Sequence, residues 1–311
     1  MEKTSSVGIS DLINIGSAGN ASESQLNYLI RGELGEHVLR PYQLDAHGQK
    51  MVTEANAQVV ASYAVTNQFR RPKAFFDYQF ARLAKAMPLP VTTAMDLGCG
   101  LGALGRELVS RGLAKHCFSV DSNPEAIAHL EAKLKLEAAP TMTPVLADLT
   151  RLEWKNEKVD LVIGNSFFHQ LADNRQALKN ILTFLKPGGV LFLTSEPSVN
   201  AAMLENPISF LVAKLRARKA TTMTNVWTYS DKALTAMLEE LGFENIEIRG
   251  HGFLSSLANY TFLTVWTKLL RLPVPAPVWS VLFKMMYLER RMFSFLPTNW
   301  FCGLGVIAKA K

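Results

Sequence analysis

The sequence predicts an α/β protein built on a parallel sheet with helices on both faces. Short apolar runs alternate with amphipathic segments between residues 91 and 250, a pattern typical of consecutive βαβ units. A glycine-rich stretch follows the first run and opens a helical pattern, as in many ligand-binding turns. The five predicted strands are TTAMDLG (92–98), CFSVD (117–121), TPVLAD (143–148), VDLVIGNS (159–166) and GVLFLTSE (189–196).

Two further strands and several helices complete the expected fold. NIEIRG (245–250) and GLGVIAKAK (303–311) predict a sixth and a seventh strand, separated by about fifty residues that read as apolar helices around a proline-rich joint. We therefore divide the chain into an N-terminal helical cap (1–88), a core (89–252), a helical insertion (253–300) and a final core strand (301–311).

The composition indicates whether the chain can form a core, which partners are expected and in which compartment it works. The chain has 311 residues, 48% hydrophobic and 19% charged, which is enough for a buried core. Its net charge of +6 is scattered, so nucleic acid is not the expected partner. The three cysteines fit neither a zinc site nor a disulfide framework and predict reduced thiols in a cytoplasmic protein. The first residues lack a signal-peptide pattern, and no stretch predicts a membrane span.

The glycine-rich loop DLGCGLG (96–102) points to a particular kind of ligand. Asp96 at its head would repel the pyrophosphate of a dinucleotide, and the Gly-Lys-Ser/Thr ending of a phosphate-binding loop is absent. An acid at this position favours a ligand with a positive end. Asp121 ends the second strand, 25 residues after Asp96, where a carboxylate accepts hydrogen bonds from both ribose hydroxyls.

These motifs resemble those of the class I S-adenosylmethionine-dependent methyltransferases that act on small molecules. DLGCGLG, VDSNPEAI, ADLTRLEW, DLVIGNSFFHQ and LKPGGVLFLT occur in that family's order and spacing across about half the chain. The resemblance implies a Rossmann-like sheet of seven strands with the last antiparallel, and S-adenosylmethionine as cofactor. It also implies the cofactor-binding residues: Asp96, Gly98, Cys99, Gly100 and Gly102 in the loop, Asp121 and Ser122 at the ribose, Asp148 and Leu149 at adenine, and Asn165 and Ser166 beside the amino acid moiety.

Two residues are candidates for catalysis. His169 follows the fourth strand and has the chemistry of a general base, although FFHQ could simply cap the next helix. Glu196 follows the fifth strand and could orient a substrate, or be a structural loop acid. His251 and Tyr229 are weaker candidates, and no cluster of side chains indicates a metal.

The helical additions are expected to select the acceptor. Phe76, Tyr78, Met286 and Tyr287 could line an apolar pocket, or they could be helix packing. Basic residues in the insertion leave open a contact with a membrane surface or an anionic substrate. We expect methyl transfer to oxygen, nitrogen or carbon of a small apolar or aromatic metabolite. The alternatives are another use of S-adenosylmethionine, such as cyclisation releasing methylthioadenosine, or a non-catalytic cofactor-binding subunit. The sequence does not fix the oligomeric state.

Overall fold

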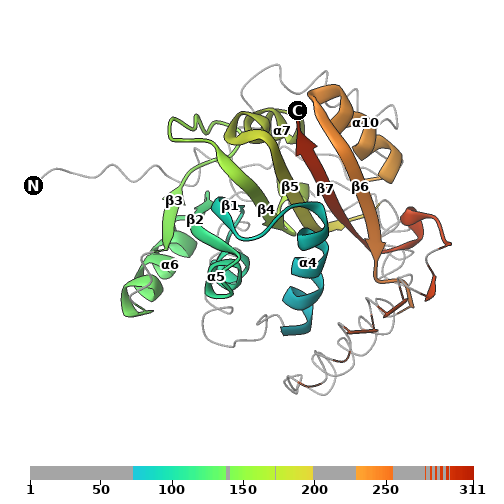
Figure 1. The fold of residues 1–311 in the computed structure, drawn as a ribbon, viewed down its shortest axis with the longest axis horizontal. Helices are drawn as coiled ribbons and strands as arrows, with labels where there is room; N and C mark the ends of the chain where they lie inside the picture. The colour runs from blue at the N-terminus through green and yellow to red at the C-terminus, as the bar shows by residue number, and fades with distance from the viewer. Residues whose placement is uncertain are drawn as a thin grey trace, which may run out of the picture.

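The computed structural model describes residues 73–137, 141–171, 173–198, 229–254 and 295–311, with single residues between 277 and 293. Its centre is a seven-stranded sheet in the order β3-β2-β1-β4-β5-β7-β6 (Figure 1). The first five strands pair in parallel, and β7 runs antiparallel to both its neighbours. The strands are β1 (Val91–Leu97), β2 (Ala114–Asp121), β3 (Met142–Leu146), β4 (Val159–Asn165), β5 (Leu185–Pro197), β6 (Phe243–His251) and β7 (Gly303–Ala310).

Helices cover both faces of this sheet, and each face has its own apolar core. Along β5, Val190 and Phe192 belong to one core, while Leu191 and Leu193 belong to the other. This alternation follows from the two-residue period of a strand. One core packs under α4 (Lys73–Ala86), α5 (Ala103–Ser110) and α6 (Pro124–Glu137), and the other under α7 (Asn174–Phe184) and α10 (Asp231–Leu241).

The expected α/β architecture is confirmed, including all seven strands and the antiparallel last strand. The third strand ends at Leu146, so Asp148 lies just beyond it. Residues 1–72 and most of the insertion lie outside the described residues, so the proposed division into caps and core stays a prediction. In the described part of the chain, no helix is both long and apolar enough to cross a membrane.

Asp96 connects the first strand to the first core helix. Its carboxylate is only 2% exposed, and Oδ2 accepts the backbone N–H of Gly105 in α5 at 2.8 Å. A side chain at Gly105 would place its Cβ 3.0 Å from that oxygen. Burial raises the pKa of Asp96 to about 7, against the opposing effect of the Gly105 hydrogen bond. The connection from β1 to α5 is therefore fixed by a hydrogen bond to the Asp96 side chain, whose pKa lies near neutral pH.

This pKa makes a testable link between pH and stability. Because the folded-state pKa of Asp96 lies above its ordinary value of 3.8, the folded protein holds more protons than the unfolded chain between these values. The contribution of Asp96 to stability therefore falls as pH rises towards 7. Relative to wild type, Asp96→Asn should gain roughly 2–3 kcal/mol in unfolding free energy between pH 5 and pH 8, measured by urea denaturation.

Asp160 provides a matched control, because its pKa is lowered whereas that of Asp96 is raised. Burial raises the pKa of Asp160, but hydrogen bonds from Lys186 and from the Thr93 amide outweigh it and leave the pKa lowered. Its stabilising contribution is present above pH 4 and is constant from pH 5 to pH 8. Asp160→Asn should therefore lose the same stability at both pH values. If the stability difference between Asp96→Asn and wild type is likewise independent of pH, the raised pKa is wrong.

Candidate active site

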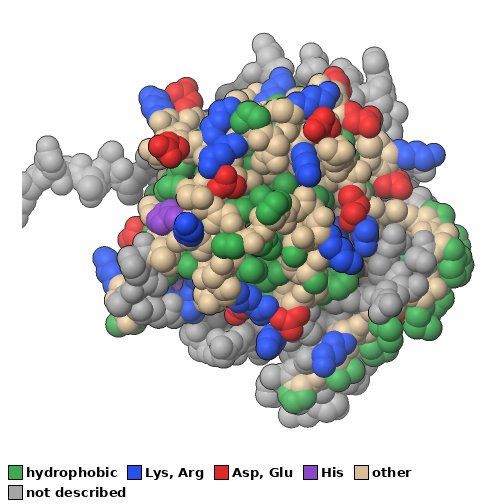
Figure 2. Space-filling view, in the orientation of Figure 1, with side chains coloured by type: hydrophobic (Ala, Val, Ile, Leu, Met, Phe, Trp, Pro, Cys, Tyr) green, Lys and Arg blue, Asp and Glu red, His purple; other side chains and the backbone are tan. Residues whose placement is uncertain are grey.

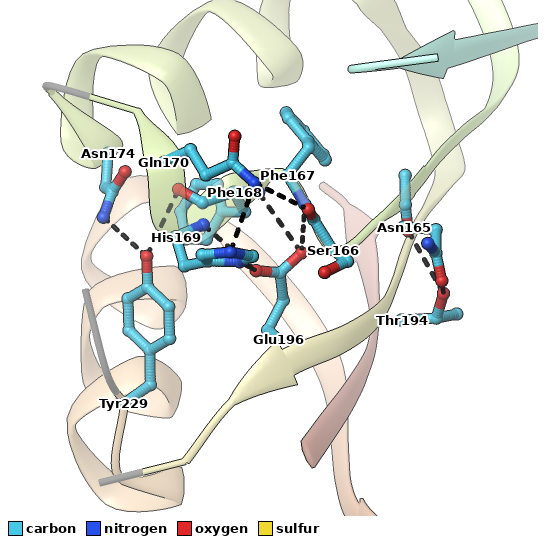
Figure 3. Close-up of polar contacts among 11 residues, drawn as sticks. Asn165, Ser166, Phe167, Phe168, His169, Gln170, Asn174, Thr194, Glu196 and Tyr229 are labelled. Carbon is cyan, nitrogen blue, oxygen red and sulfur yellow. Dashed lines mark hydrogen bonds and ion pairs between the residues drawn. The ribbon is translucent and has the colours of Figure 1, made fainter. Parts of the chain in front are cut away.

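Glu196 and His169 meet at the carboxyl edge of the sheet. His169 lies in η2 (Phe168–Gln170), the short turn after β4, and Glu196 lies near the end of β5. Glu196 Oε1 accepts the backbone N–H groups of Phe167 and Phe168, each at 3.2 Å. Oε2 accepts the His169 N–H at 3.0 Å and lies 2.8 Å from His169 Nδ1 (Figure 3). One fully buried carboxylate thus binds three successive amides and an imidazole.

This arrangement defines the chemistry of the imidazole. Since a carboxylate only accepts hydrogen bonds, the neutral His169 ring carries its proton on Nδ1 and leaves the Nε2 lone pair free. Gln170 Nε2 lies 3.4 Å from His169 Nε2, which suits an amide donor facing that lone pair. The His169 side chain is 11% exposed. The two predicted catalytic residues are therefore brought together in the arrangement of an oriented general base.

Two serines beside the site, one directly after β4 and one at the bulge in β5, have their backbone in the left-handed region. Ser166, directly after β4, has φ +55°, and Ser195, next to Glu196, has φ +59°. The Ser166 N–H donates to the Thr194 carbonyl at 2.8 Å, so the two segments that carry these serines are hydrogen-bonded to each other. Residues other than glycine rarely adopt this conformation, and such strain is frequent at functional sites. The sequence carries no signal for it, because serine does not specify a positive φ.

Tyr229 supports η2 from behind. Its ring stacks on Phe168 with centroids 5.5 Å apart, and its hydroxyl accepts from Asn174 Nδ2 at 2.6 Å. The same hydroxyl donates to the Phe168 carbonyl at 3.4 Å. Burial, and then the negative charge of Glu196, raise the pKa of Tyr229 well above its ordinary value. Tyr229 is therefore a neutral hydrogen-bonding group in the wall of the site.

The glycines of the loop differ in what surrounds them. A Cβ on Gly98 would lie 2.4 Å from the Phe167 side chain, and one on Gly102 would lie 2.7 Å from Leu130. At Gly100, with φ +52°, no atom lies within 4 Å of that position. Gly98 and Gly102 thus leave room for neighbouring protein side chains, which a Cβ at either position would overlap. Of these three glycines, only Gly100 has open space at its Cβ position. The role of Phe167 was not predicted from the sequence.

Two carboxylates beside this loop fit a nucleoside. Asp121 accepts the Gly100 N–H at 2.8 Å and the Asn123 N–H at 2.9 Å, and burial raises its pKa. Asp148 Oδ1 accepts from the Thr150 amide and hydroxyl. Its Oδ2 is buried, accepts no hydrogen bond from the described residues, and lies 3.9 Å from Arg151 Nε in a long ion pair. A buried acceptor without a donor suits an amine such as that of adenine.

The remaining predicted residues are less informative. The Cys99 thiol faces the Gly100 carbonyl at 3.6 Å, and burial raises its pKa. Asn165 Oδ1 accepts from Thr194 Oγ1 at 2.9 Å, and Leu149 is buried in the core. Ser122 follows β2 and is exposed. Within the ranges that the structure describes, no three His, Cys, Asp or Glu side chains are grouped to hold a metal ion.

The predicted acceptor-binding residues are only partly described. Phe76 is buried in α4, stacked on Phe80 and in contact with the guanidinium of Arg111, so helix packing accounts for it. Tyr78 is half-buried. Met286 and Tyr287 lie outside the described residues. Contact of these four residues with an acceptor stays a prediction.

Comparisons with known proteins find methyltransferases among the similar sequences and structures. The family described as "Methyltransferase domain" matches residues 95–193. A carboxy-S-adenosyl-L-methionine synthase of Geobacter metallireducens is 34% identical over 32% of this chain and 43% of its own length. A trans-aconitate 2-methyltransferase of Azoarcus is 33% identical over 37% of this chain and 45% of its own length. The chain therefore spans less than half the length of these two relatives.

A solved structure of similar fold comes from Haemonchus contortus. Its phosphoethanolamine N-methyltransferase 2, in complex with S-adenosyl-L-methionine, has a TM-score of 0.54 and 16% sequence identity, covering 81% of this chain and 56% of its own. At this identity the likeness concerns the fold alone. The strand order, the glycine loop with its acids, and the matched family together lead to one conclusion. Residues 95–193 of this chain match a methyltransferase domain and lie within a Rossmann-like sheet of seven strands.

Proposed function

We propose that this protein transfers a methyl group to an oxygen, nitrogen or carbon atom of a small, apolar or aromatic metabolite, with His169 as general base. The observation that carries the proposal is the pairing of His169 Nδ1 with the buried carboxylate of Glu196 at 2.8 Å. It leaves a proton acceptor, Nε2, at the carboxyl edge of the sheet, where ligands of open α/β sheets bind.

Cofactor binding is assigned to the loop and the strand ends beside it. Asp121 would accept the ribose hydroxyls and Asp148 Oδ2 the adenine amine, while Gly100 leaves room for close approach. Asp96, Asn165 and Ser166 are assigned to the methionine end. When bound, S-adenosylmethionine supplies an activated methyl group on a cationic sulfur.

The chain's own residues then have three tasks. His169 Nε2 takes the proton of an acceptor hydroxyl, amine or acidic carbon. Glu196 holds the imidazole in the required tautomer and stabilises its charged form. The Gln170 side chain, whose Nε2 lies 3.4 Å from His169 Nε2, must move away so that the acceptor can approach the base. Of the predicted acceptor contacts, half-buried Tyr78 is more accessible than buried Phe76, and Met286 and Tyr287 would contribute from the insertion.

A second candidate function follows from the relatives. Three of the curated relatives are named carboxy-S-adenosyl-L-methionine synthase. By its name, such an enzyme produces a cofactor derivative with an added carboxyl group. A product assay separates the two functions, because methyl transfer releases S-adenosylhomocysteine and the synthase reaction does not. Methylthioadenosine would indicate cyclisation, and no turnover with any acceptor would indicate a cofactor-binding subunit.

Loss of the carboxylate at residue 121 should weaken cofactor binding. Each hydrogen bond to a charged group contributes roughly 1.5–3 kcal/mol, so Asp121→Ala should bind S-adenosylhomocysteine at least tenfold more weakly in calorimetry. Asp231→Ala, at the start of α10, is the control and should bind normally. Unchanged affinity in a folded Asp121→Ala protein removes Asp121 from the site.

The base is tested by a double-mutant comparison. His169→Ala should lower turnover by about two to four orders of magnitude with S-adenosylhomocysteine affinity nearly unchanged. Glu196→Gln should also lower turnover, because its amide N–H₂ would face Nδ1 and favour the wrong tautomer. If Glu196 acts through His169, the double variant should be no slower than His169→Ala, measured alongside thermal unfolding. Additive losses would show that Glu196 has an independent role, and a loss under threefold for His169→Ala would exclude it as the base.

A further inference from the structure

Exposed apolar side chains are concentrated in one part of this chain. Of the nine large hydrophobic side chains that are exposed in the described ranges, seven lie between residues 254 and 300. Figure 2 shows hydrophobic side chains gathered at the lower right, where Figure 1 places the described parts of the insertion. Contiguous exposed apolar surface of this kind marks an interaction site. The seven residues are Leu254, Val281, Met285, Leu288, Met292, Phe295 and Trp300.

Five of these residues make up what we call the outer stripe: Val281, Met285, Leu288, Met292 and Phe295. They recur at alternating intervals of four and three residues, the spacing of one helix face. Val281, Met285, Leu288 and Met292 are in helical conformation. The outer stripe is 44–77% exposed.

The opposite side of this segment is attached to the core. Glu289 is buried, and its Oε2 accepts the Phe253 N–H at 3.0 Å. The Phe293 ring packs on Phe253 with centroids 5.5 Å apart, and Phe253 packs in turn on Phe301. The segment is therefore held against the ends of β6 and β7 by one side, which turns the outer stripe away from the core.

Charge indicates what this stripe contacts. Residues 253–300 carry Lys268, Arg271, Lys284, Arg290 and Arg291 against the single acid Glu289, so their net charge is 5 − 1 = +4 of the chain's +6. The one acid is buried, whereas Lys284 is exposed beside the stripe. If the same segments of two copies faced each other, a net charge of +4 would face another of +4 and the two would repel. An anionic surface complements this positive charge.

We propose that the outer stripe lies on the surface of an anionic lipid bilayer, with its apolar side chains at the level of the acyl boundary and its basic residues at the headgroups. A helix with an apolar face and a basic border binds membranes in this way. Phe295 and exposed Trp300 add aromatic side chains of the type enriched at membrane interfaces. The helix lies on the bilayer and does not cross it.

The position of the stripe connects it to the candidate active site. β6 ends at His251 and β7 begins at Gly303, which pairs with Pro197, the residue after Glu196. The insertion thus leaves the sheet at the edge that carries His169 and Glu196. This step rests on the proposed function: a protein docked there would take an amphiphilic acceptor from the bilayer.

Vesicle flotation with the full-length protein tests the docking without requiring activity. The wild-type protein should float with vesicles of phosphatidylcholine containing 30% phosphatidylserine, and about tenfold less with phosphatidylcholine alone. Leu288→Glu/Met292→Glu should lower binding to the anionic vesicles at least tenfold. The matched control is Leu136→Glu, which changes an 88% exposed leucine of α6 outside the stripe and should bind as wild type. Lys284→Glu/Arg291→Glu should weaken binding about fivefold for each charge removed.

Several outcomes would overturn the proposal. Absence of wild-type flotation with anionic vesicles is one, and equal loss of binding in Leu136→Glu is another. A concentration-dependent dimer that Leu288→Glu/Met292→Glu converts to a monomer, without vesicle binding, would assign the stripe to self-association. S-adenosylhomocysteine binding, measured in the same proteins, reports separately on the proposed function and should be unchanged in all of these variants.

Discussion

A carboxylate that water cannot reach must find its hydrogen-bond donors inside the protein, and the candidate site is organised around one such group. Glu196 receives the N–H groups of Phe167, Phe168 and His169 and the His169 ring. These donors all belong to the turn after β4, so one side chain of β5 makes four hydrogen bonds to that turn. The position of the imidazole therefore depends on the pairing of these two strands. An unpaired buried carboxylate is costly, which ties the turn, the base and the carboxylate into one unit.

The same pairing accounts for the unusual backbone around the site. Asn165 pairs with Thr194 at the last step of the β4–β5 ladder, and a left-handed serine follows each of them: Ser166 after the end of β4, and Ser195 at the bulge where β5 continues beside β7. Such a conformation costs on the order of 1–3 kcal/mol for each residue. Four hydrogen bonds to Glu196 offset that cost. The turn after β4 can thus leave the line of the strand and bring its first residues across the glycine loop, where Phe167 covers Gly98.

Much of the fold could be predicted because buried parallel strands are continuous apolar runs separated by helices. The ends of those runs also locate Asp121, Asp148, His169 and Glu196 at one edge. The contact between His169 and Glu196 could not be predicted, because the two residues are 27 positions apart and meet only through adjacent strands. The sequence treats the loop glycines alike, yet Phe167 and Leu130 fill the space at Gly98 and Gly102 and leave Gly100 open. Such differences depend on packing between distant segments, which spacing along the chain does not encode.

Charged residues of opposite sign are associated with the same edge of the sheet: acids in the candidate site, and a basic insertion that leaves the sheet there. Asp121 and Glu196 are held at this edge by backbone N–H groups, and as carboxylates they contribute negative potential to the site. Beyond β6 and β7, the insertion contributes +4, with its one acid turned inward. The overall charge of +6 is therefore not a uniform property of the surface. Acids at this edge would favour the proposed cationic cofactor, and exposed Lys284 beyond it would favour the proposed anionic surface, so a single edge would serve both without competition between the two ligands.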